Sequence, residues 1–411
     1  MSLIHEHRRN TEPGLFFEQA GEGYSGGPPK VRLLAYYLPQ FHPIPENDRA
    51  WGKGFTEWTN VTKATPNFLG HYQPHLPGEL GFYDLRSREV LKRQAAMAKK
   101  YGIYGFCFQY YWFNGTPLLD APLKLLLADK SIDINFCINW ANENWTRRWD
   151  GKEKEVIVAQ TYSIESDLTF ARSLEPLLRD PRYVRVEGRP LIMLYRPEVL
   201  PDAKATVARW RAHFLKEGLG NPYVVMPQEH ETVDPRKFDL DAAAGFPPHG
   251  NGISTWMRRG WRKITRLHFK RGGILCSYDE MVKHGISYRP TDFILHPGVC
   301  PSWDNTARRG LQSQIFLGST PKKYGAWLKD TCQYVLNNRK PDERIVFINA
   351  WNEWGEGAHL EPDRRFGYAY LAETARALQT LDTSDQAFVA LQHPSGETFG
   401  TVQTVPFERW T

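Results

Sequence analysis

The sequence predicts a single (β/α)8 TIM-like barrel, because short apolar runs alternate with helical segments and are followed by polar and aromatic residues. Eight such runs cover residues 31–38, 103–108, 132–138, 190–195, 223–226, 240–246, 293–299 and 345–348. Short, continuous apolar runs are typical of strands that are buried on both faces, as in parallel sheets. Eight parallel strands that alternate with helices can close into a barrel.

Helical segments are predicted between most of the runs, from apolar residues that recur every three or four positions. They cover residues 86–101, 118–128, 164–178, 203–216, 321–336 and 366–378. The first has the clearest amphipathic pattern and ends at Gly102, a residue type that often ends helices. Residues 234–238, after the fifth run, form a poor helical pattern, so we expect that unit to be abbreviated.

Two long insertions interrupt the pattern, residues 43–84 after the first strand and roughly residues 249–290 after the sixth. Loops of this length in a compact domain usually have a function. We expect residues 1–30 to be an N-terminal leader or linker, residues 31–382 to be the catalytic barrel, and residues 383–411 to be a C-terminal appendage.

An open, doubly wound sheet is the competing architecture for alternating strands and helices. That fold predicts a Gly-rich phosphate-binding turn after the first strand. The residues at this position are Leu38-Pro39-Gln40-Phe41-His42. They do not form such a turn, so the barrel is favoured.

The composition is that of an ordinary globular protein, with 41% hydrophobic and 24% charged residues in a chain of 411. There are 14 Trp residues, and we expect part of this surplus to line a binding site. The five Cys residues are widely spaced and include no CxxC pair. Neither a disulfide framework nor a zinc site is therefore expected.

The N terminus contains no apolar signal-peptide region, and no run of 18 apolar residues occurs. We therefore expect a cytoplasmic protein without an integral membrane segment, or one module of a larger protein. The net charge is +6, and the basic residues are scattered apart from a cluster within residues 258–271. A solvated loop or helix explains that cluster more simply than a site for an anionic glycan, a phosphate group or a membrane, and no nucleic-acid partner is expected.

The most informative motif follows the last apolar run and reads Asn352-Glu353-Trp354-Gly355-Glu356-Gly357. Barrel enzymes place their active sites at the C-terminal ends of the strands. Glycoside cleavage uses two carboxyl groups, of which one protonates the leaving oxygen while the other manages the nucleophile or the charge at the sugar carbon. A polar loop would explain the glycines but not two carboxylates beside Trp, where desolvation costs stability. We therefore predict Glu353 and Glu356 as the catalytic pair.

Aromatic residues beside amides and carboxylates recur at several predicted strand ends. This composition suits sugars, because their C–H faces stack on rings while their hydroxyl groups bind fixed polar groups. The predicted substrate-binding residues are Tyr37, His42, Glu57, Trp58, Tyr111, Trp112, Asn139, Asn142, Glu143, Trp145, Glu229, Trp303, Asp304, Asn352 and Trp354.

Packing is the alternative for several of these residues. A minority of the Trp residues should cap the barrel core, and Trp140 is the candidate for this role. Glu57 and Trp58 are equally consistent with a substrate-binding lid and with a packed loop whose glycines form turns. For His42, a hydrogen bond to a loop carbonyl is slightly favoured over a contact with a sugar.

Two acidic patterns could in principle hold a metal, but neither is predicted to do so. Glu229-His230-Glu231 has the right composition, yet adjacent residues on a strand point to opposite faces. Asp239-Leu240-Asp241 matches the DxD pattern of many glycosyltransferases, but it precedes a predicted strand and so lies at the wrong end of the barrel. No metal or other cofactor is expected.

Several longer motifs of this chain resemble the WbsX-like family, which is labelled glycosyltransferase and occurs in bacterial O-antigen and polysaccharide loci. The motifs are residues 38–47, 51–58, 139–145, 303–306 and 351–357, and the resemblance extends from about residue 31 to 375. This family is in turn similar to glycoside hydrolase family 99, which contains retaining endo-α-mannosidases and mannanases on a (β/α)8 barrel. The similarity rests chiefly on residues 352–357.

In family 99 the two Glu residues of this motif are the catalytic pair. The resemblance implies that Glu353 deprotonates the 2-hydroxyl of the sugar to form a 1,2-anhydro sugar. It also implies that Glu356 protonates the leaving oxygen and later activates water. The position that is His in family 99 is Gly355 here, and the other strand-end residues do not align, so the identity of the substrate does not transfer.

The leading hypothesis is a retaining enzyme that cleaves or transglycosylates a bacterial surface polysaccharide or its intermediate, with a glycan as its partner. The alternative is a glycosyltransferase of O-antigen or polysaccharide biosynthesis, which the family label supports and the missing Gly-rich nucleotide cradle opposes. A barrel that only binds glycans is the third hypothesis. The presence of both Glu353 and Glu356 argues against it.

Overall fold

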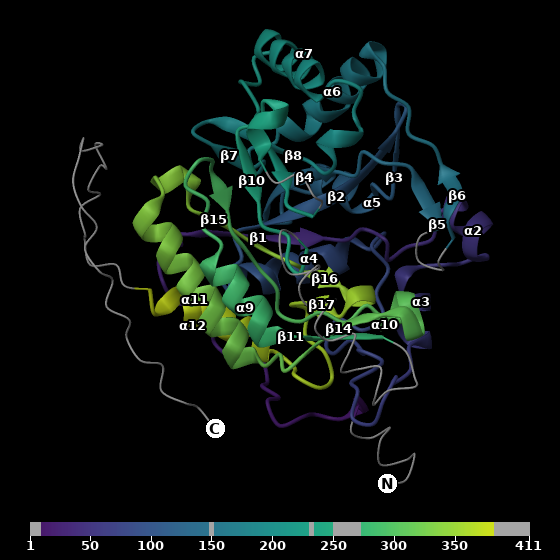
Figure 1. Cartoon of the computed structure of the whole chain (residues 1–411), viewed down its shortest axis with the longest axis vertical. Helices are drawn as coiled ribbons and strands as arrows, with labels where there is room; N and C mark the ends of the chain where they lie inside the picture. Colours follow the sequence, from purple (N-terminus) through teal and green to yellow (C-terminus); the bar gives the residue numbers. More distant parts are fainter. Residues whose placement is uncertain (1–9, 148–151, 230–233, 250–272, 382–411) are drawn as a thin grey trace.

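The protein is described by a computed structural model for residues 10–147, 152–229, 234–249 and 273–381. Its centre is a nearly closed barrel of parallel strands, with helices packed around it (Figure 1). The barrel strands are β1 (Arg32–Tyr37), β2 (Gly105–Phe113), β4 (Asn135–Trp140), β8 (Arg189–Leu194), β9 (Tyr223–Pro227), β10 (Ala242–Ala244), β12 (Leu295–His296), β13 (Gly298–Val299) and β15 (Ile345–Ile348).

The barrel closes through the segment that contains β12 and β13. The strand order is β12-β10-β9-β8-β4-β2-β1-β15-β13, and every neighbouring pair is parallel. β12 and β13 are two halves of one extended segment that is divided at Pro297, which has no amide hydrogen to donate. The carbonyl of Pro297 still accepts a hydrogen bond from the Phe347 amide at 2.9 Å. The nine strands therefore occupy eight positions, which confirms the predicted (β/α)8 class.

Two glycines allow the chain to close at this point. An amide-to-carbonyl hydrogen bond of 2.8 Å joins Gly245, after β10, to His296. A Cβ atom on Gly245 would lie closer than 3.0 Å to the backbone of Gly298, and a Cβ atom on Gly298 would meet Gly245 in the same way. Neither position has room for a side chain while the strands keep this spacing.

The helices follow the predicted order. The larger ones are α4 (Arg88–Lys100), α5 (Ala121–Ala128), α6 (Ile164–Leu178), α7 (Ala203–Lys216), α9 (Tyr278–Ser287), α11 (Pro321–Asn338) and α12 (Ala369–Gln379). Helices α6 and α7 pack together on one side of the barrel, and α11 packs against α9 and α12 on another (Figure 1). The unit after β9 contains only the 3-10 helix η3 (Pro235–Phe238), so the predicted abbreviation is confirmed. Helix α9 lies in the second insertion and was not predicted.

Side-chain caps fix the starts of several of these helices. Ser163 and Ser166 form a reciprocal capping box at the start of α6. Asp202 and Thr320 accept hydrogen bonds from the amides of Ala205 and Lys323, at the starts of α7 and α11. Each such cap satisfies a backbone amide that has no partner within its helix, and is typically worth about 1 kcal/mol.

An aromatic cluster fills the space between the barrel and helices α6 and α7. The ring of Trp140 on β4 stacks on Phe170 of α6 at 4.0 Å and contacts Trp210 of α7 at 5.7 Å. Trp112 packs edge-on against Trp140 and Phe170, and it is fully buried. The structural role expected for Trp140 is confirmed. Trp112, predicted to bind substrate, belongs to the same packing cluster.

The connecting segments contain further short elements. They are α2 (Pro45–Trp51) and α3 (Glu57–Lys63) in the first insertion, β3 (Thr116–Leu118), β5 (Trp145–Arg147), β6 (Lys152–Val158), β7 (Arg185–Val186), η2 (Pro197–Val199), β11 (Ile274–Ser277), α10 (Thr306–Arg309), η4 (Gly310–Gln312), β14 (Gln314–Leu317), η5 (Pro341–Glu343), β16 (Asn352–Glu353), η6 (Trp354–Glu356) and β17 (Ala358–His359). The first insertion therefore folds into two short helices. Part of the second, residues 250–272, lies outside the described residues, as does the basic cluster at residues 258–271.

The described part of the N-terminal segment lies against the barrel. The Gly14 amide binds the Arg365 carbonyl at 2.8 Å, and the Tyr24 amide binds the Lys100 carbonyl at the same distance. Residues 382–411 are outside the described residues. Among the helices that the structure describes, none combines the length and the apolar character needed to cross a membrane.

The close contact of Gly245 with Gly298, where the barrel closes, leads to a testable prediction. Gly245→Ala should lower the free energy of unfolding by about 1–3 kcal/mol, because the added methyl group must displace the backbone at Gly298. Gly21→Ala is the matched control, since a Cβ atom there meets nothing within 4 Å, and it should change stability by no more than about 0.5 kcal/mol. Urea unfolding of both variants measures the difference. Equal stability of the two variants would contradict the described closure.

Candidate active site

The C-terminal ends of the barrel strands surround a pocket of about 250 Å³. Residues at the strand ends, or in the loops that follow the strands, line it. Eight of the residues predicted from the sequence are among them: Tyr37, Tyr111, Glu143, Trp145, Glu229, Trp303, Glu353 and Glu356. The pocket also contains residues that were not predicted, including Gln40, Phe113, His249, Arg308 and Asn349.

The two predicted catalytic residues lie on a short hairpin after β15. In this hairpin β16 pairs with β17 in antiparallel register, with Asn352 opposite His359 and Glu353 opposite Ala358. Gly357 closes the turn with a φ of 59°, a left-handed conformation that favours glycine. The hairpin thus holds Glu353 and Glu356 at the pocket on defined backbone structure.

Asn352 and Trp354 hold this hairpin in place from behind, although both were predicted to bind substrate. The side chain of Asn352 accepts a hydrogen bond from the Leu38 amide at 2.8 Å and donates one to the Leu38 carbonyl at 3.0 Å. It therefore joins the hairpin to the end of β1. The indole nitrogen of Trp354 donates to Glu361 at 2.7 Å, and the ring stacks on His359 at 3.7 Å.

Glu361 is a buried carboxyl group beneath the hairpin. Besides Trp354, it accepts hydrogen bonds from the Tyr83 hydroxyl at 2.7 Å and the Gln94 amide at 2.6 Å. Burial raises the pKa of Glu361 to about 7, although these donors act in the opposite direction. The group satisfies several buried donors at once, so its position supports the hairpin.

One guanidinium group binds three carboxylates at the edge of the pocket. Arg308 Nη2 lies 2.6 Å from Glu353 Oε1, and Arg308 Nη1 lies 2.8 Å from Glu356 Oε1. Its Nε atom lies 2.7 Å from Glu57 Oε1. The side chain of Arg308 is 7% exposed and that of Glu57 is fully buried. Helix α10 and helix α3 of the first insertion therefore meet the hairpin through charged contacts.

Three carboxyl groups of the described residues share the guanidinium group of Arg308. If all three Glu residues were ionised, one Arg would leave two negative charges in a buried site, which is unfavourable. Burial, together with the neighbouring charges of Glu356 and Glu57, raises the pKa of Glu353 well above its ordinary value, in spite of the opposing effect of Arg308. Burial alone would lower the pKa of Arg308, but its three carboxylate partners raise it well above the ordinary value. Arg308 thus stays charged while the carboxyl groups compete for a proton.

Gly355 is required by the same cluster. A Cβ atom at this position would lie closer than 3.0 Å to both Glu57 Oε1 and Arg308 Nε. The ion pair of Glu57 and Arg308 therefore occupies the space that a side chain at position 355 would need. This explains why the motif has Gly between Trp354 and Glu356.

Three aromatic rings pack together in the part of the pocket formed by β2 and β5. The ring of Trp145 stacks on Tyr111 at 5.2 Å, with 19° between the planes, and on Phe113 at 6.2 Å, with 11°. The Tyr111 hydroxyl accepts a hydrogen bond from the Gln40 side chain at 2.7 Å. Glu143, which also lines the pocket, pairs with Arg196 at 2.7 Å. Stacked rings beside charged groups form a surface that can bind a sugar ring and its hydroxyl groups.

Six other residues predicted to bind substrate lie outside the pocket lining: His42, Glu57, Trp58, Asn139, Asn142 and Asp304. Each is buried. The Trp58 indole donates to the Tyr83 carbonyl at 2.8 Å, and the Asn139 amide donates to Gln109 at 2.8 Å. The side chain of Asn142 donates a hydrogen bond to the Arg196 carbonyl and accepts one from the Arg196 amide. Burial lowers the pKa of His42, which fits the structural interpretation of that residue.

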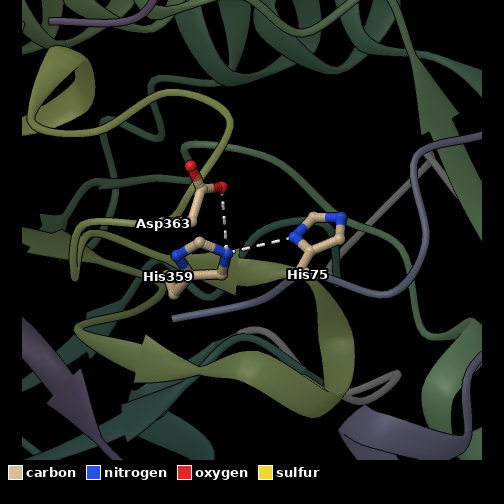
Figure 2. Close-up of side chains that lie close together, drawn as sticks. All are labelled: His75, His359 and Asp363. Atoms are coloured by element: carbon tan, nitrogen blue, oxygen red, sulfur yellow. Dashed lines mark hydrogen bonds and ion pairs between the residues drawn. The ribbon is translucent and has the colours of Figure 1, made fainter. Parts of the chain in front are cut away.

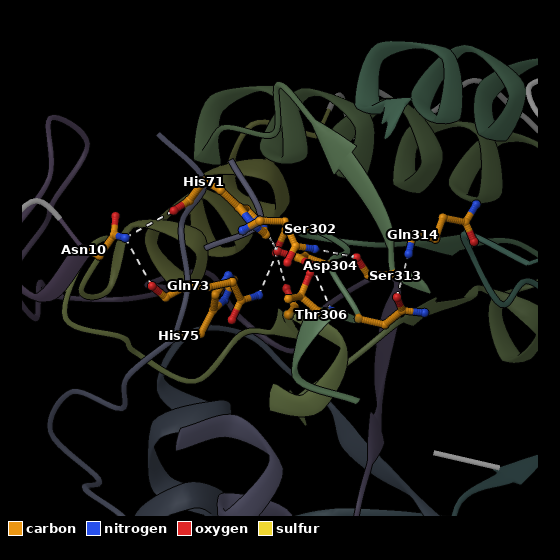
Figure 3. A network of polar contacts seen from close by, with 12 residues as sticks. Asn10, His71, Gln73, His75, Ser302, Asp304, Thr306, Ser313 and Gln314 are labelled. Atoms are coloured by element: carbon orange, nitrogen blue, oxygen red, sulfur yellow. Dashed lines mark hydrogen bonds and ion pairs between the residues drawn. The ribbon is translucent and has the colours of Figure 1, made fainter. Parts of the chain in front are cut away.

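Asp304 belongs to a polar network beside the hairpin (Figure 3). Its carboxylate contacts His71 Nε2 at 2.6 Å and accepts hydrogen bonds from Gln73 at 2.7 Å and Thr306 at 3.0 Å. The Asp304 amide donates to the Glu356 carbonyl at 2.7 Å. Asp304 thus fixes the start of α10, the helix that contains Arg308, against the hairpin and the first insertion.

The acidic patterns considered for metal binding can also be located. Asp241 binds Arg189 at 2.6 Å and the Val224 amide at 2.8 Å, near the N-terminal ends of β8 and β9. The DxD pattern is therefore at the end of the barrel opposite the pocket, as predicted. Glu229 lines the pocket, whereas His230 and Glu231 lie outside the described residues.

Comparisons with known proteins agree with this architecture. A family model described as glycosyltransferase WbsX matches residues 33–374. Two curated relatives come from two strains of Xanthomonas campestris pv. campestris, and both are named uncharacterized protein WxcX. Each is 46% identical to this chain over 347 residues. The match covers 84% of this chain and 49% of each relative, so the chain spans about half the length of these relatives.

Two solved structures share the fold. One is a glycoside hydrolase-like protein with a TM-score of 0.55 at 15% identity, covering 88% of this chain and 98% of that protein. The other is the GH99 endo-alpha-mannosidase from Bacteroides thetaiotaomicron, with a TM-score of 0.50 at 16% identity, covering 85% and 96%. The fold is therefore glycoside hydrolase-like.

The charged cluster predicts that Arg308→Met is strongly destabilising. Removing the guanidinium group leaves buried carboxylates without their counter-charge, which typically costs about 3–5 kcal/mol. Arg86→Met is the matched control, because its ion pair with Asp84 is exposed and should contribute no more than about 1 kcal/mol. Chemical unfolding of both variants tests the difference.

The loss of stability caused by Arg308→Met should also depend on pH. A carboxyl group with a raised pKa binds its proton more tightly in the folded state, so it favours folding at low pH and this stability is lost as the pH rises through the folded pKa. Without Arg308 the pKa of Glu353 should rise further, since that charge now lowers it. The free energy of unfolding of the variant should therefore fall least at pH values below the ordinary pKa of 4.5, and progressively more at higher pH. A loss that is independent of pH would contradict this account of the cluster.

Proposed function

We propose that this chain, which belongs to the family described as glycosyltransferase WbsX, cleaves or transfers a glycosidic bond with the carboxyl groups of Glu353 and Glu356. The observation that carries the proposal is the hairpin after β15, which presents both groups to one aromatic-walled pocket. The proposed substrate is a bacterial surface polysaccharide or its intermediate, in keeping with the resemblance to proteins of polysaccharide loci. The GH99 endo-alpha-mannosidase with the same fold supports cleavage as the reaction type.

The proposed route is the one that the resemblance to family 99 implies. Glu353 accepts the proton of the 2-hydroxyl while the 2-oxygen attacks the anomeric carbon. The bond to the leaving oxygen breaks, and Glu356 donates a proton to that oxygen, which leaves a 1,2-anhydro sugar. Water then attacks the anomeric carbon and gives a proton to Glu356, while Glu353 returns its proton to the 2-oxygen. Two inversions give net retention, and an acceptor hydroxyl in place of water gives transfer.

The charge of the cluster supports such an exchange of protons. Burial raises the pKa of Glu353 well above its ordinary value, which makes its carboxylate a stronger base, but the group acts as a base only in its ionised form. Arg308 contacts both Glu353 and Glu356, and by itself it would favour their ionised forms. Because Glu57 competes for the same guanidinium group, the cluster as a whole can retain a proton. The proposed route requires this proton on Glu356, with Glu353 ionised, when the leaving oxygen departs. This proton belongs to the coupled group of carboxyls, as expected for strongly interacting sites.

In this proposal Arg308 is a positioning residue and the aromatic surface binds the sugar. Arg308 sets the distance between the two carboxyl groups and their shared charge. The rings of Tyr111 and Trp145 can stack on the C–H face of a sugar, while Glu143 and Glu229 accept hydrogen bonds from hydroxyl groups.

A glycosyltransferase that uses an activated sugar donor is the second candidate, and the family description favours it. Two observations count against a metal-bound nucleotide at the DxD pattern. Asp241 already binds Arg189 and the Val224 amide, and it lies at the opposite end of the barrel from the pocket. The segment after β1 is also not a Gly-rich phosphate-binding turn.

Separate substitution of the two carboxylates tests the roles. Glu356→Gln should lose activity by about 10²-fold or more on a natural glycan. It should retain more activity on an aryl glycoside, whose acidic leaving group needs no proton. Glu353→Gln should lose activity on both substrates, since the nucleophile must be activated whatever departs. Rates on the surface polysaccharide of the source organism and on aryl glycosides, with product masses as readout, measure this.

Glu198→Gln is the matched control for these substitutions, because Glu198 pairs with Arg196 but does not line the pocket. Its activity should stay close to that of the wild type. Equal and mild effects of Glu353→Gln and Glu356→Gln would show that the roles are assigned to the wrong residues. Rapid cleavage of a substrate without a 2-hydroxyl would exclude the anhydro route.

The glycosyltransferase alternative makes an opposite prediction about donors. If the chain is a hydrolase or transglycosylase, a nucleoside-diphosphate sugar with Mn²⁺ should not raise its melting temperature. A thermal shift assay on the wild type and on Asp241→Ala tests this. A donor-dependent shift that disappears in Asp241→Ala would support the glycosyltransferase instead.

A further inference from the structure

We propose that His75, His359 and Asp363 bind one divalent transition-metal ion, with zinc as the best fit, behind the catalytic hairpin. Their ligand atoms all lie within 4.8 Å of one another, and the three side chains are buried (Figure 2). His75 Nδ1 lies 3.0 Å from His359 Nε2, which in turn lies 3.8 Å from Asp363 Oδ2. None of the three residues lines the pocket, so this site is separate from the one described above.

The spacing of these atoms suits a small tetrahedral ion. Zinc binds imidazole nitrogen and carboxylate oxygen at about 2.0–2.2 Å, which separates two ligand atoms of a tetrahedron by roughly 3.3 Å. The two distances at His359 Nε2 lie on either side of this value. Two imidazoles and one carboxylate favour zinc and similar transition metals over calcium or magnesium, which prefer oxygen ligands. A fourth position remains for water.

The hydrogen bond made by His359 Nδ1 directs the other ring nitrogen, Nε2, toward the proposed site. His359 Nδ1 lies 3.0 Å from the Glu361 carbonyl, which can only accept a hydrogen bond, so Nδ1 carries the proton. A neutral ring protonated on Nδ1 has a lone pair on Nε2. Metal-binding His residues commonly donate their other ring nitrogen to a carbonyl in this way.

The contact of His359 with Asp363 is explained better by a cation than by a hydrogen bond. Without a metal ion, His75 Nδ1 can donate its proton in a hydrogen bond to His359 Nε2 at 3.0 Å, but His359 Nε2 and Asp363 Oδ2 are 3.8 Å apart, which is beyond hydrogen-bond distance. A bound ion would take the place of that proton and contact all three ligand atoms. The Tyr72 hydroxyl donates to Asp363 Oδ2 at 3.1 Å, and its ring stacks on His75 at 4.2 Å. These contacts orient the other two ligands, while Arg365 lies over the ring of Tyr72.

The ion would connect two segments that support the catalytic hairpin. His359 belongs to β17, faces Asn352 in the hairpin register and stacks on Trp354. His75 belongs to the first insertion, close to His71 and Gln73, which bind Asp304 (Figure 3). The proposed role is therefore structural, because the ion would fix the hairpin to the insertion without contacting substrate.

Cobalt binding to the whole protein tests the site directly. After removal of bound metal with a chelator, the wild type should bind one equivalent of Co²⁺ and show the visible absorption of a tetrahedral imidazole site, and Zn²⁺ should displace it. Zn²⁺ at about a hundredfold its dissociation constant should raise the melting temperature by about 3 °C or more. His75→Gln and Asp363→Asn should lose both effects.

His213→Gln is the matched control, because His213 pairs with Glu175 away from the cluster, and it should behave like the wild type. If stripped wild-type protein shows neither the absorption nor the thermal shift, the three side chains form a hydrogen-bonded cluster only and the proposal is wrong. Equal Co²⁺ binding by His75→Gln and Asp363→Asn would place the ion elsewhere. Should the variants fail to fold, the titration of the wild type still decides the question.

Discussion

The contact of Arg308 with Glu57, Glu353 and Glu356 is the interaction on which the arrangement of the pocket depends. A single buried guanidinium group joins α10, the first insertion and the hairpin after β15. It requires a glycine at position 355, because any side chain there would displace the ion pair with Glu57. Burial, with the neighbouring charges of Glu356 and Glu57, raises the pKa of Glu353 well above its ordinary value, although Arg308 opposes this effect. The contact with Arg308 thus fixes the position of both proposed reacting groups, while burial and the neighbouring carboxylates raise the pKa of Glu353.

The surrounding polar residues hold this cluster in place. Asn352 ties the hairpin to β1, Glu361 binds the indole of Trp354 from below, and Asp304 fixes the start of α10. All three are buried polar groups with hydrogen-bond partners, which is how such groups become tolerable inside a protein. The first insertion contributes in the same way through Glu57. Much of the polar chemistry near the strand ends thus serves to position a few groups that face the pocket.

The barrel itself could be predicted from the sequence because its strands are continuous apolar runs with helices between them. Glu353 and Glu356 could be proposed as a catalytic pair because two carboxylates beside Trp are conspicuous in sequence, but the hairpin that holds them was not predicted. Arg308 could not be found in this way, since it meets Glu57 across 251 positions and no local pattern marks it. The sequence also did not reveal which face of a strand points into the pocket. Tyr111 and Trp112 are neighbours on β2, yet Tyr111 lines the pocket while Trp112 packs against Phe170 of α6, because successive residues of a strand point in opposite directions.

The central claim is that the three carboxyl groups around Arg308 share one proton, which Glu353 binds in the free protein and which must stand on Glu356 when the leaving oxygen is protonated. A pH titration of the protein with ¹³C-labelled Glu carboxyl groups, followed by NMR, measures this directly. The account predicts one resonance that titrates well above the ordinary value of 4.5 and is absent from Glu353→Gln. The separate resonance of Glu361, near pH 7, should remain in that variant. If Glu353→Gln removes only a resonance that titrates at or below 4.5, the charged cluster does not hold the proton and the account is wrong.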